Sequence, residues 1–268
     1  MLKNILLNEN ITEYALIPFD NNLVINERLL PQGDINSILV FLVPYRCETT
    51  AKDEYGVSAY ARVKDYHGYM KGLFERIVPR LTEAYSTPFY GFSDHSPLNE
   101  KLCAAHGGLG VIGKNSLLIN KKYGSFVFIG ICLSALKPDT PLKPIESCIN
   151  CGMCAAACPG NAIGDGIILS ENCLSGLSQK KKLTDEEQEK VTKARICWGC
   201  DICQNDCPMN KNALFTPITY FAETFLETLS PKVIQDMSDD EYKQYAFSWR
   251  KKEVILRNMY ALDRNKHK

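Results

Sequence analysis

The sequence predicts an α+β fold with three parts: an N-terminal α/β layer domain, a small cysteine-rich module and a short helical C-terminal segment. Two observations predict it. Apolar runs of strand length alternate with helical periodicity in the first half of the chain, and two cysteine runs follow a proline-rich stretch. With 268 residues and 45% hydrophobic content, the chain is longer than a usual single domain and can bury a real core. We expect the parts to span residues 1–137, 138–214 and 215–268.

Short apolar runs predict the strands of the first part. Each is long enough to cross a sheet and is buried on at least one face. The runs are Tyr14 to Phe19, Ser37 to Tyr45, Thr87 to Phe92, Ser116 to Asn120 and Ser125 to Leu136.

Two helices are predicted among these strands. Apolar residues recur at a spacing of three and four between Val57 and Tyr85, which describes one face of a helix. A second helix should end near Gly107, with Asp94 or Ser96 as its cap and Pro97 at its first position.

The second half of the chain begins with a stretch that favours neither helix nor strand, Lys137 to Ile145, in which every third residue is proline (Pro138, Pro141 and Pro144). The lysine- and glutamate-rich segment from Gln179 to Lys193 suits a solvated helix, and the chain is predicted to be helical again from Phe215.

Charge and hydropathy limit the classes of function. The chain has 31 basic and 31 acidic residues, so no global field draws it to nucleic acid or to a membrane surface. No apolar run approaches the roughly 18 residues of a membrane span. The first residues, MLKNILLNENITEY, do not resemble a secretory signal, so we expect the reducing cytoplasm, where disulfides are rare.

The cysteines follow one pattern twice, C-x2-C-x2-C-x3-C-P. The first run is Cys148, Cys151, Cys154 and Cys158 before Pro159, and the second is Cys197, Cys200, Cys203 and Cys207 before Pro208. In this spacing three thiolates hold one iron–sulfur cubane and the fourth binds the neighbouring one. A zinc site needs only four ligands, usually in two separated pairs. The runs therefore predict a ferredoxin-like module with two 4Fe-4S clusters that exchange their last cysteines.

Beyond the cysteines, five further stretches stand in order along the chain: YARVKDYHGYM, SDHSPLNEKLCAAHGGLGVIGKNSLLIN, YGSFVFIG, ENCLSGLSQKK and CWGCDICQNDCPMN. Together these stretches resemble the epoxyqueuosine reductase family over roughly residues 35 to 212. The resemblance implies a cobalamin between the N-terminal and cluster domains, clusters that feed it electrons, and two-electron removal of the epoxide oxygen of epoxyqueuosine in tRNA. It also implies an external electron donor of the flavodoxin or ferredoxin type.

The resemblance makes Asp94 the acid that protonates the leaving oxygen. That role needs a carboxyl group with a raised pKa, which burial beside an apolar corrin could provide. Spacing alone favours a helix cap at this position.

The resemblance also implies contacts with the cobalamin. Lysine and asparagine can meet corrin amides or a phosphate, and glycine permits close backbone approach. By position these contacts are Ser58, Tyr60, Asp94, Lys114, Asn115, Gly124, Ser125, Ile129, Cys132 and Ser175. Asp65 and His67 begin the D-x-H-x-x-G cobalt-ligand pattern, but Met70 replaces its glycine, which agrees with a base-off cobalamin without a histidine ligand.

Two departures from the family pattern matter. Family members take one ligand of the second cluster from a lone cysteine, here Cys173, whereas ferredoxin spacing selects Cys197; we expect Cys173, because the residues around it match the family as well, with Cys197 as the alternative. Family members also continue into helical repeats that grip the tRNA, and only SWRKKEVILRNMYAL resembles the first of these helices. A tRNA partner would therefore depend on Lys180 to Lys182 and the basic C-terminal helix, with modest affinity.

Two other functions fit the same residues. One is a corrinoid iron–sulfur reductase with a different substrate, such as a halogenated compound. The other is a two-cluster electron carrier without catalytic activity, against which the N-terminal resemblance argues.

Overall fold

The computed structural model of the protein describes residues 1–49, 54–138, 140–164 and 167–266. Of the segments predicted above, Asp139 in the proline-rich stretch and residues 267–268 at the basic C-terminal end lie outside these ranges.

The N-terminal part is built on a four-stranded antiparallel sheet with the strand order β1-β2-β7-β4. All four strands fall within predicted apolar runs. They are β1 (Tyr14–Pro18), β2 (Ser37–Pro44), β4 (Phe89–Phe92) and β7 (Val127–Ser134). The central strands β2 and β7 pair along their full length, from Ser37 opposite Ser134 to Pro44 opposite Val127.

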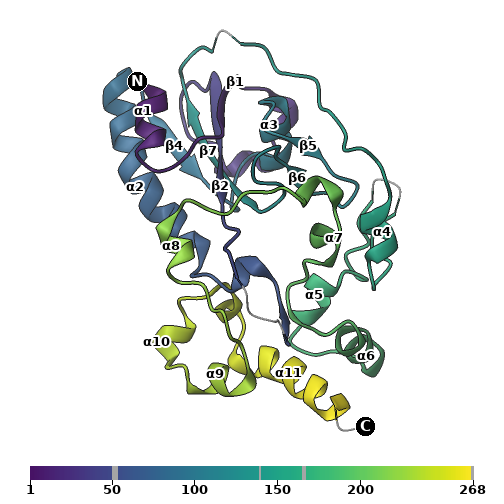
Figure 1. Ribbon diagram of the computed structural model, residues 1–268. Coiled ribbons are helices and arrows are strands. Elements are labelled where there is room, and N and C mark those ends of the chain that lie inside the picture. Colours follow the sequence, from purple (N-terminus) through teal and green to yellow (C-terminus); the bar gives the residue numbers. More distant parts are fainter. Residues whose placement is uncertain (50–53, 139, 165–166, 267–268) are drawn as a thin grey trace.

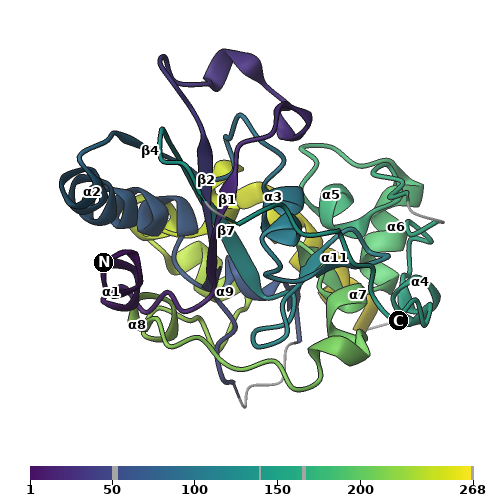
Figure 2. The ribbon, with the colours of Figure 1, turned by 90° about the horizontal axis from the view of Figure 1, so that it is seen from above.

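Helices cover both faces of this sheet, which explains why every residue of β2 is buried. On one face Leu39, Phe41 and Val43 pack under α1 (Leu2–Leu7) and α2 (Tyr66–Tyr85). On the other face the alternate residues of β2 pack under α3 (Glu100–His106). Figures 1 and 2 show α1 and α2 on one side of the strands and α3 on the other. Because successive side chains of a strand point to opposite faces of the sheet, β2 contributes residues to two separate hydrophobic cores.

Both predicted helices of this part begin later than expected. Helix α2 begins at Tyr66, where the Asp65 side chain accepts the His67 N–H, and Val57 lies in a strand instead. Helix α3 begins at Glu100, capped by Asn99, whose side chain accepts the Leu102 N–H. Asp94 and Ser96 are therefore not its caps, because they lie in the loop before Asn99.

Short helices form the cysteine-rich module, on the right in Figure 1. They are α4 (Met153–Ala157), α5 (Leu174–Ser178), α6 (Asp185–Lys193) and α7 (Ile202–Asn205), followed by the 3-10 helix η4 (Pro208–Asn210). Thr184 begins α6 with a capping box to Glu187, as suits a solvated charged helix. A two-stranded hairpin, β5 (Val111–Ile112) and β6 (Leu118–Ile119), reaches this module from the first part: the Cys148 N–H donates to the Ile112 carbonyl over 3.2 Å.

The C-terminal segment closes a core of its own against the cysteine-rich module. Strand β3 (Gly56–Val57) leaves the first part and pairs in parallel with β8 (Ile196–Trp198). Trp198 is fully buried there with Phe247 and Ile255. The remaining elements are helices and 3-10 turns: η1 (Asn21–Leu23), η2 (Glu27–Leu29), η3 (Ala59–Ala61), α8 (Thr219–Ala222), α9 (Pro231–Asp236), α10 (Asp239–Tyr242), η5 (Ala246–Trp249) and α11 (Lys252–Lys266).

Candidate functional site

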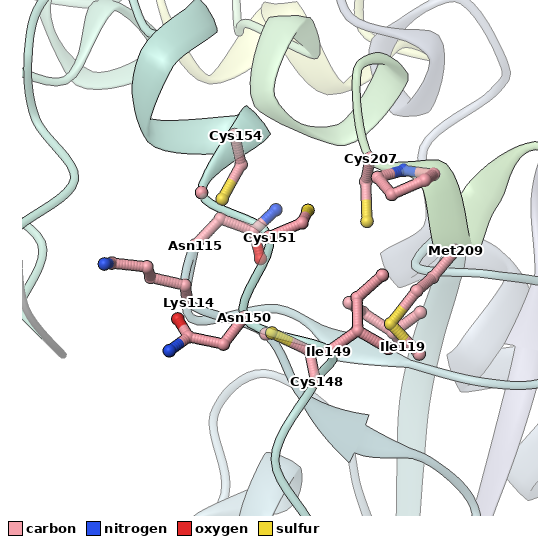
Figure 3. A pocket seen from close by; sticks show the side chains of 13 residues that line it. Lys114, Asn115, Ile119, Cys148, Ile149, Asn150, Cys151, Cys154, Cys207 and Met209 are labelled. Carbon is pink, nitrogen blue, oxygen red and sulfur yellow. The ribbon is translucent and has the colours of Figure 1, made fainter.

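Four cysteines, three from the first run and one from the second, line a first cavity. Figure 3 shows the side chains of Cys148, Cys151, Cys154 and Cys207 around it. Cys148 and Cys151 lie in the turn that leads into α4 and Cys154 lies in its first turn; between them Gly152 has a φ of 78°, a left-handed conformation that favours glycine. The last cysteine of the second run, Cys207, reaches the cavity from the start of η4.

A second cavity has the complementary set of thiols. It is lined by Cys158, the last cysteine of the first run, together with Cys173, Cys200 and Cys203. Apolar side chains such as Leu174 complete its wall. The Ala162 N–H donates to the Cys158 sulfur over 3.3 Å. Each cavity therefore offers four thiols, which is the ligand count of a 4Fe-4S cluster.

Cys197 lines neither cavity. It has no exposed surface and lies in the middle of β8, in the core under α11. Its carbonyl accepts from Asn258 of α11 over 2.9 Å. Cys173, in contrast, directly precedes α5 and enters the second cavity.

Burial dominates the acidity of the thiols in the second cavity. It raises the pKa of Cys200 to about 12 and that of Cys203 to about 11, and the neighbouring thiol Cys173 raises both further. Cysteines ligate metals as thiolates, and a bound metal ion deprotonates them outright. The walls thus keep these thiols away from water, and the charge of bound iron would set their protonation.

Asp94 lies outside both cavities, on an exposed loop. Its side chain is 64% exposed and its φ is 64°. The backbone N–H of Asp94 donates to the Glu100 carboxylate over 2.8 Å, and its own carboxylate oxygen Oδ2 lies 3.3 Å from Nε2 of His67. Tyr66, which stacks on Phe128 with ring centroids 4.2 Å apart, hydrogen-bonds to the Asp94 carboxylate.

The groups around Asp94 have shifted pKa values. Burial raises the pKa of Glu100 to about 7, and the negative charge of Asp94 adds to the rise. Burial alone would lower the pKa of His67, but hydrogen bonds and charges from Asp65 and Asp94 outweigh it and raise the pKa. Burial and the nearby Asp94 charge raise the pKa of Tyr66. The burial that was expected at Asp94 is therefore found six residues further along the chain, at Glu100.

Three of the expected cobalamin contacts come together where β3 meets β8 and α5. The Ser58 N–H donates to the Trp198 carbonyl, and its hydroxyl donates to Asp201. Trp198 and Gln179 lie beside the Tyr60 hydroxyl and lower its pKa, although burial outweighs them, and Gln179 in turn donates to the carbonyl of Ser175 over 2.8 Å. Ser58, Tyr60 and Ser175 therefore share one seam between the first part and the cysteine-rich module.

Three other residues expected to contact cobalamin make contacts inside the protein. Gly124 has a φ of 60°, and a Cβ atom there would lie 2.4 Å from Oδ1 of Asn210, so the close approach that glycine permits is to Asn210. Ser125 is buried and donates from its backbone to Asn210 and from its hydroxyl to Gln204. Cys132 has no exposed surface and packs in the sheet core under α2.

The remaining residues expected to contact cobalamin lie in two places, near Asp94 and at the cluster cavities. The Ile129 carbonyl accepts from the Ser93 hydroxyl, beside Asp94. Lys114 lines the first cavity, whereas Asn115 lines both. Asn115 thus lies at the cluster cavities, which sequence reasoning did not foresee.

Sequence reasoning missed two carboxyl groups. Glu100 follows Asp94 by six residues in the DHSPLNE stretch, and its place in the first turn of a helix was the available signal. Asp201 lies between two cluster cysteines and accepts from both Ser58 and the Ala59 N–H. Asp201 is recognised as the partner of Ser58 only in the folded chain, where β3 pairs with β8.

The basic C-terminal residues are partly engaged in structural contacts. Arg250 donates to the carbonyl of Gln179, and Arg257 donates to the carbonyls of Lys180 and Lys181. Trp249 is 56% exposed, and the Arg250 guanidinium lies 3.5 Å from the centroid of its ring.

In the part of the chain that the structure describes, no helix has the length and apolar character needed to cross a bilayer.

Comparison with known proteins gives consistent results. Residues 147–210 match the 4Fe-4S double cluster binding domain. The epoxyqueuosine reductase of Leadbetterella byssophila is 32% identical over 258 residues, which cover 94% of this chain and 82% of that protein. The epoxyqueuosine reductase of Lactococcus garvieae is 31% identical over 258 residues, covering 89% of this chain and 72% of that protein.

Solved structures share the fold. Epoxyqueuosine reductase from Streptococcus thermophilus superposes with a TM-score of 0.80 at 22% identity, over 100% of this chain and 81% of that one. An epoxyqueuosine reductase bound to an epoxyqueuosine-modified tRNA-Tyr stem loop gives 0.80 at 24% identity, over 97% and 80%. A catabolic reductive dehalogenase gives 0.55 at 16% identity, over 98% of this chain and 36% of that one.

Proposed function

The chain belongs to the epoxyqueuosine reductase family, and from this membership we propose that it removes the epoxide oxygen of epoxyqueuosine in tRNA by a two-electron reduction. It is an oxidoreductase with a double 4Fe-4S cluster domain, and we propose base-off cobalamin as its third cofactor. The observation that carries the proposal is the combination of two four-cysteine cavities with an exposed carboxyl group held outside them.

The cavities support a specific set of ligands. We assign one cluster to Cys148, Cys151, Cys154 and Cys207, and the other to Cys158, Cys173, Cys200 and Cys203. Cys197 is left as a buried apolar residue of the β8 core. This assignment keeps the exchange of last cysteines that the spacing predicts and replaces only Cys197.

The seam between β3, β8 and α5 supports the proposed cobalamin site. Tyr60 and Ser175 offer hydroxyl groups there, which suit the amides at the edge of a corrin. On the Asp94 side, the stacked Tyr66 and Phe128 rings offer an apolar surface. When bound, cobalamin would supply a strongly reducing cobalt centre for the epoxide carbon.

Asp94 is the proposed acid. Its exposed carboxyl group would donate a proton to the epoxide oxygen as the C–O bond breaks. Nε2 of His67 lies 3.3 Å from Oδ2 of Asp94 and has a raised pKa, so this histidine can return the proton. Glu100 holds the backbone of Asp94 and thereby sets the direction of the carboxyl group.

The tRNA would bind along the surface near Trp249. An exposed aromatic ring provides a stacking platform for a base, and a lysine beside it, such as the exposed Lys251, attracts phosphate. An external donor of the flavodoxin or ferredoxin type would supply the electrons. We place the reaction in the reducing cytoplasm, where thiolate-bound clusters persist.

The test is reconstitution under anaerobic conditions with iron, sulfide and cobalamin. The reduced protein is then incubated with epoxyqueuosine-bearing tRNA and, separately, with the free nucleoside, and queuosine is measured by mass spectrometry. Queuosine formed only with cobalamin present supports the proposal. Full cluster loading and cobalamin binding without turnover of either substrate would refute the substrate assignment.

A further inference from the structure

Asn115 is shared by the two cluster cavities. It lines the first cavity together with Cys148, Cys151, Cys154 and Cys207, and it also lines the second. Figure 3 shows its side chain among the thiols of Cys151, Cys154 and Cys207. Its amide also lies beside the thiol of Cys203 in the second cavity. The side chain therefore lies between the two sets of thiols.

The amide nitrogen of Asn115 is buried beside a cluster cysteine. Asn115 is only 7% exposed, and among the described residues its Nδ2 atom makes no well-formed hydrogen bond. The acceptor that the amide approaches is the Cys203 thiol, whose pKa burial raises and Asn115, as a hydrogen-bond donor, lowers. The Oδ1 atom of Asn115 accepts the Leu117 N–H over 3.4 Å, which leaves Nδ2 for the sulfur. A buried donor is costly unless it meets a good acceptor, and a sulfur that carries negative charge is a better acceptor than a neutral thiol.

The backbone around Asn115 is held in place. Asn115 lies in the turn of the β5–β6 hairpin, closed by the Gly113 N–H donating to the Leu117 carbonyl over 2.8 Å. A Cβ atom on Gly113 would lie 2.4 Å from Oδ1 of Asn115, so glycine leaves room for the amide. Lys101 donates to the Ser116 carbonyl over 2.7 Å and anchors the same turn. The amide is thus pre-positioned by the first part of the chain.

We propose that Asn115 donates a hydrogen bond from Nδ2 to a sulfur atom of the cluster in the second cavity and thereby raises the reduction potential of that cluster. The proposal rests on the ligand set assigned under the proposed function. Hydrogen bonds to cluster sulfurs are one of the factors that set the potential of an iron–sulfur cluster. A donor favours the reduced cluster because reduction adds negative charge to the sulfurs. The hairpin of the N-terminal part would then tune the electron carrier next to it.

The experiment compares Asn115→Leu with the unmodified protein, after both have been reconstituted with clusters but without substrate. Leucine keeps the size of the side chain and removes the donor. Potentials are measured by a redox titration followed by electron paramagnetic resonance, and iron and sulfide are counted. We expect the ratio of reduced to oxidised second cluster at a fixed potential to fall about tenfold, which corresponds to a shift of about 59 mV to more negative potential.

Two further variants sharpen the test. Asn115→Asp keeps the acceptor for Leu117 but replaces the donor by a negative charge, so its potential should fall further than that of the leucine variant. The matched control is Asn120→Leu, since Asn120 is equally buried but its Nδ2 donates to Glu13 and to the Leu109 carbonyl. It lines neither cluster cavity. We expect Asn120→Leu to lose stability while the reduction potentials of both clusters stay unchanged.

Unchanged potentials in both Asn115 variants, with both clusters present, would overturn the inference. Loss of the second cluster from both would also overturn it, because the amide would then be needed to build the site and not to tune it. The titration uses no substrate, so a shifted potential in a protein that does not reduce epoxyqueuosine would leave this inference standing while the proposed function fails. A parent protein that takes up no second cluster would overturn both.

Discussion

The backbone N–H of Asp94 donates to the carboxylate of Glu100 over 2.8 Å, and this contact joins an exposed carboxyl group to a largely buried one. Asp94 has a left-handed backbone, which is uncommon outside glycine, asparagine and aspartate. Glu100 lies in the first turn of α3, where a negative charge is favourable. The loop that holds the proposed acid therefore depends on a residue with an unusual protonation equilibrium.

The first prediction concerns Glu100 and pH. Its pKa is about 7 in the folded protein, above the usual 4.5 of a glutamate, so the folded state binds the proton more tightly than the unfolded state. The stability from this group is complete below the unfolded pKa and is lost as the pH rises through about 7. The total loss is on the order of 3 kcal/mol. Glu100→Gln keeps the acceptor and removes the charge, so it should be more stable than the parent at about pH 8.

Urea unfolding at a series of pH values measures this effect. The parent should lose stability between about pH 5 and pH 8, and the Glu100→Gln variant should lose less. Glu186→Gln serves as the control, because the Glu186 side chain is 76% exposed and already solvated. Parallel curves for the parent and Glu100→Gln would contradict the prediction.

The second prediction concerns the proposed acid. Asp94→Asn keeps the backbone donor to Glu100 but cannot give up a proton, so turnover should fall by about 10²–10⁴-fold. Clusters and cobalamin should be retained, which absorption spectra check. Asp65→Asn is the matched control: it removes the other carboxylate on His67, and asparagine still caps α2. Undiminished turnover in Asp94→Asn would remove Asp94 as the acid.

The third prediction separates the two competing cysteines. Cys173→Ser should lose the second cluster, visible as about half the iron content of the parent, because Cys173 lines that cavity. Cys197→Ser should keep its iron and lose about 1–3 kcal/mol of stability, since it buries a hydroxyl group in the β8 core. Iron analysis and urea unfolding give both values. The reverse pattern of iron loss would assign Cys197 as the ligand.

The fourth prediction concerns tRNA. Trp249→Ala should weaken binding about tenfold, because stacking of a base on an aromatic ring is worth about 1–3 kcal/mol. Trp249→Phe keeps an aromatic face and should retain most of the affinity. Lys251→Gln should lower the slope of log affinity against log salt concentration by about one, as expected when one phosphate contact is lost. Binding of a fluorescent stem loop measures all three, and equal affinities for the parent and Trp249→Ala would place the tRNA elsewhere.

The sequence predicted the sheet well, because runs such as Ser37 to Tyr45 are apolar enough to be buried on both faces. It predicted helix starts poorly, since Asp94, Ser96 and Asn99 are all suitable caps and only the fold selects Asn99. The cysteine spacing indicated two clusters.

Other features depend on contacts between distant segments. Periodicity cannot reveal that Val57 pairs with Trp198, or that α11 covers Cys197. For the same reason the sequence did not show that Asn115 reaches both cavities, because the β5–β6 hairpin and the cysteine-rich module meet only in the folded chain.

The cover that α11 places over β8 has a consequence for biosynthesis. Asn258 of α11 donates both to the carbonyl of Cys197 and to that of Ser178, at the end of α5. Helix α11 follows both cysteine runs in the sequence, so Cys173 and Cys197 both leave the ribosome before the helix that covers Cys197. With the ligand set proposed above, the late docking of α11 withdraws Cys197 from competition for iron. Correct metal loading would then depend on the order in which the chain is made.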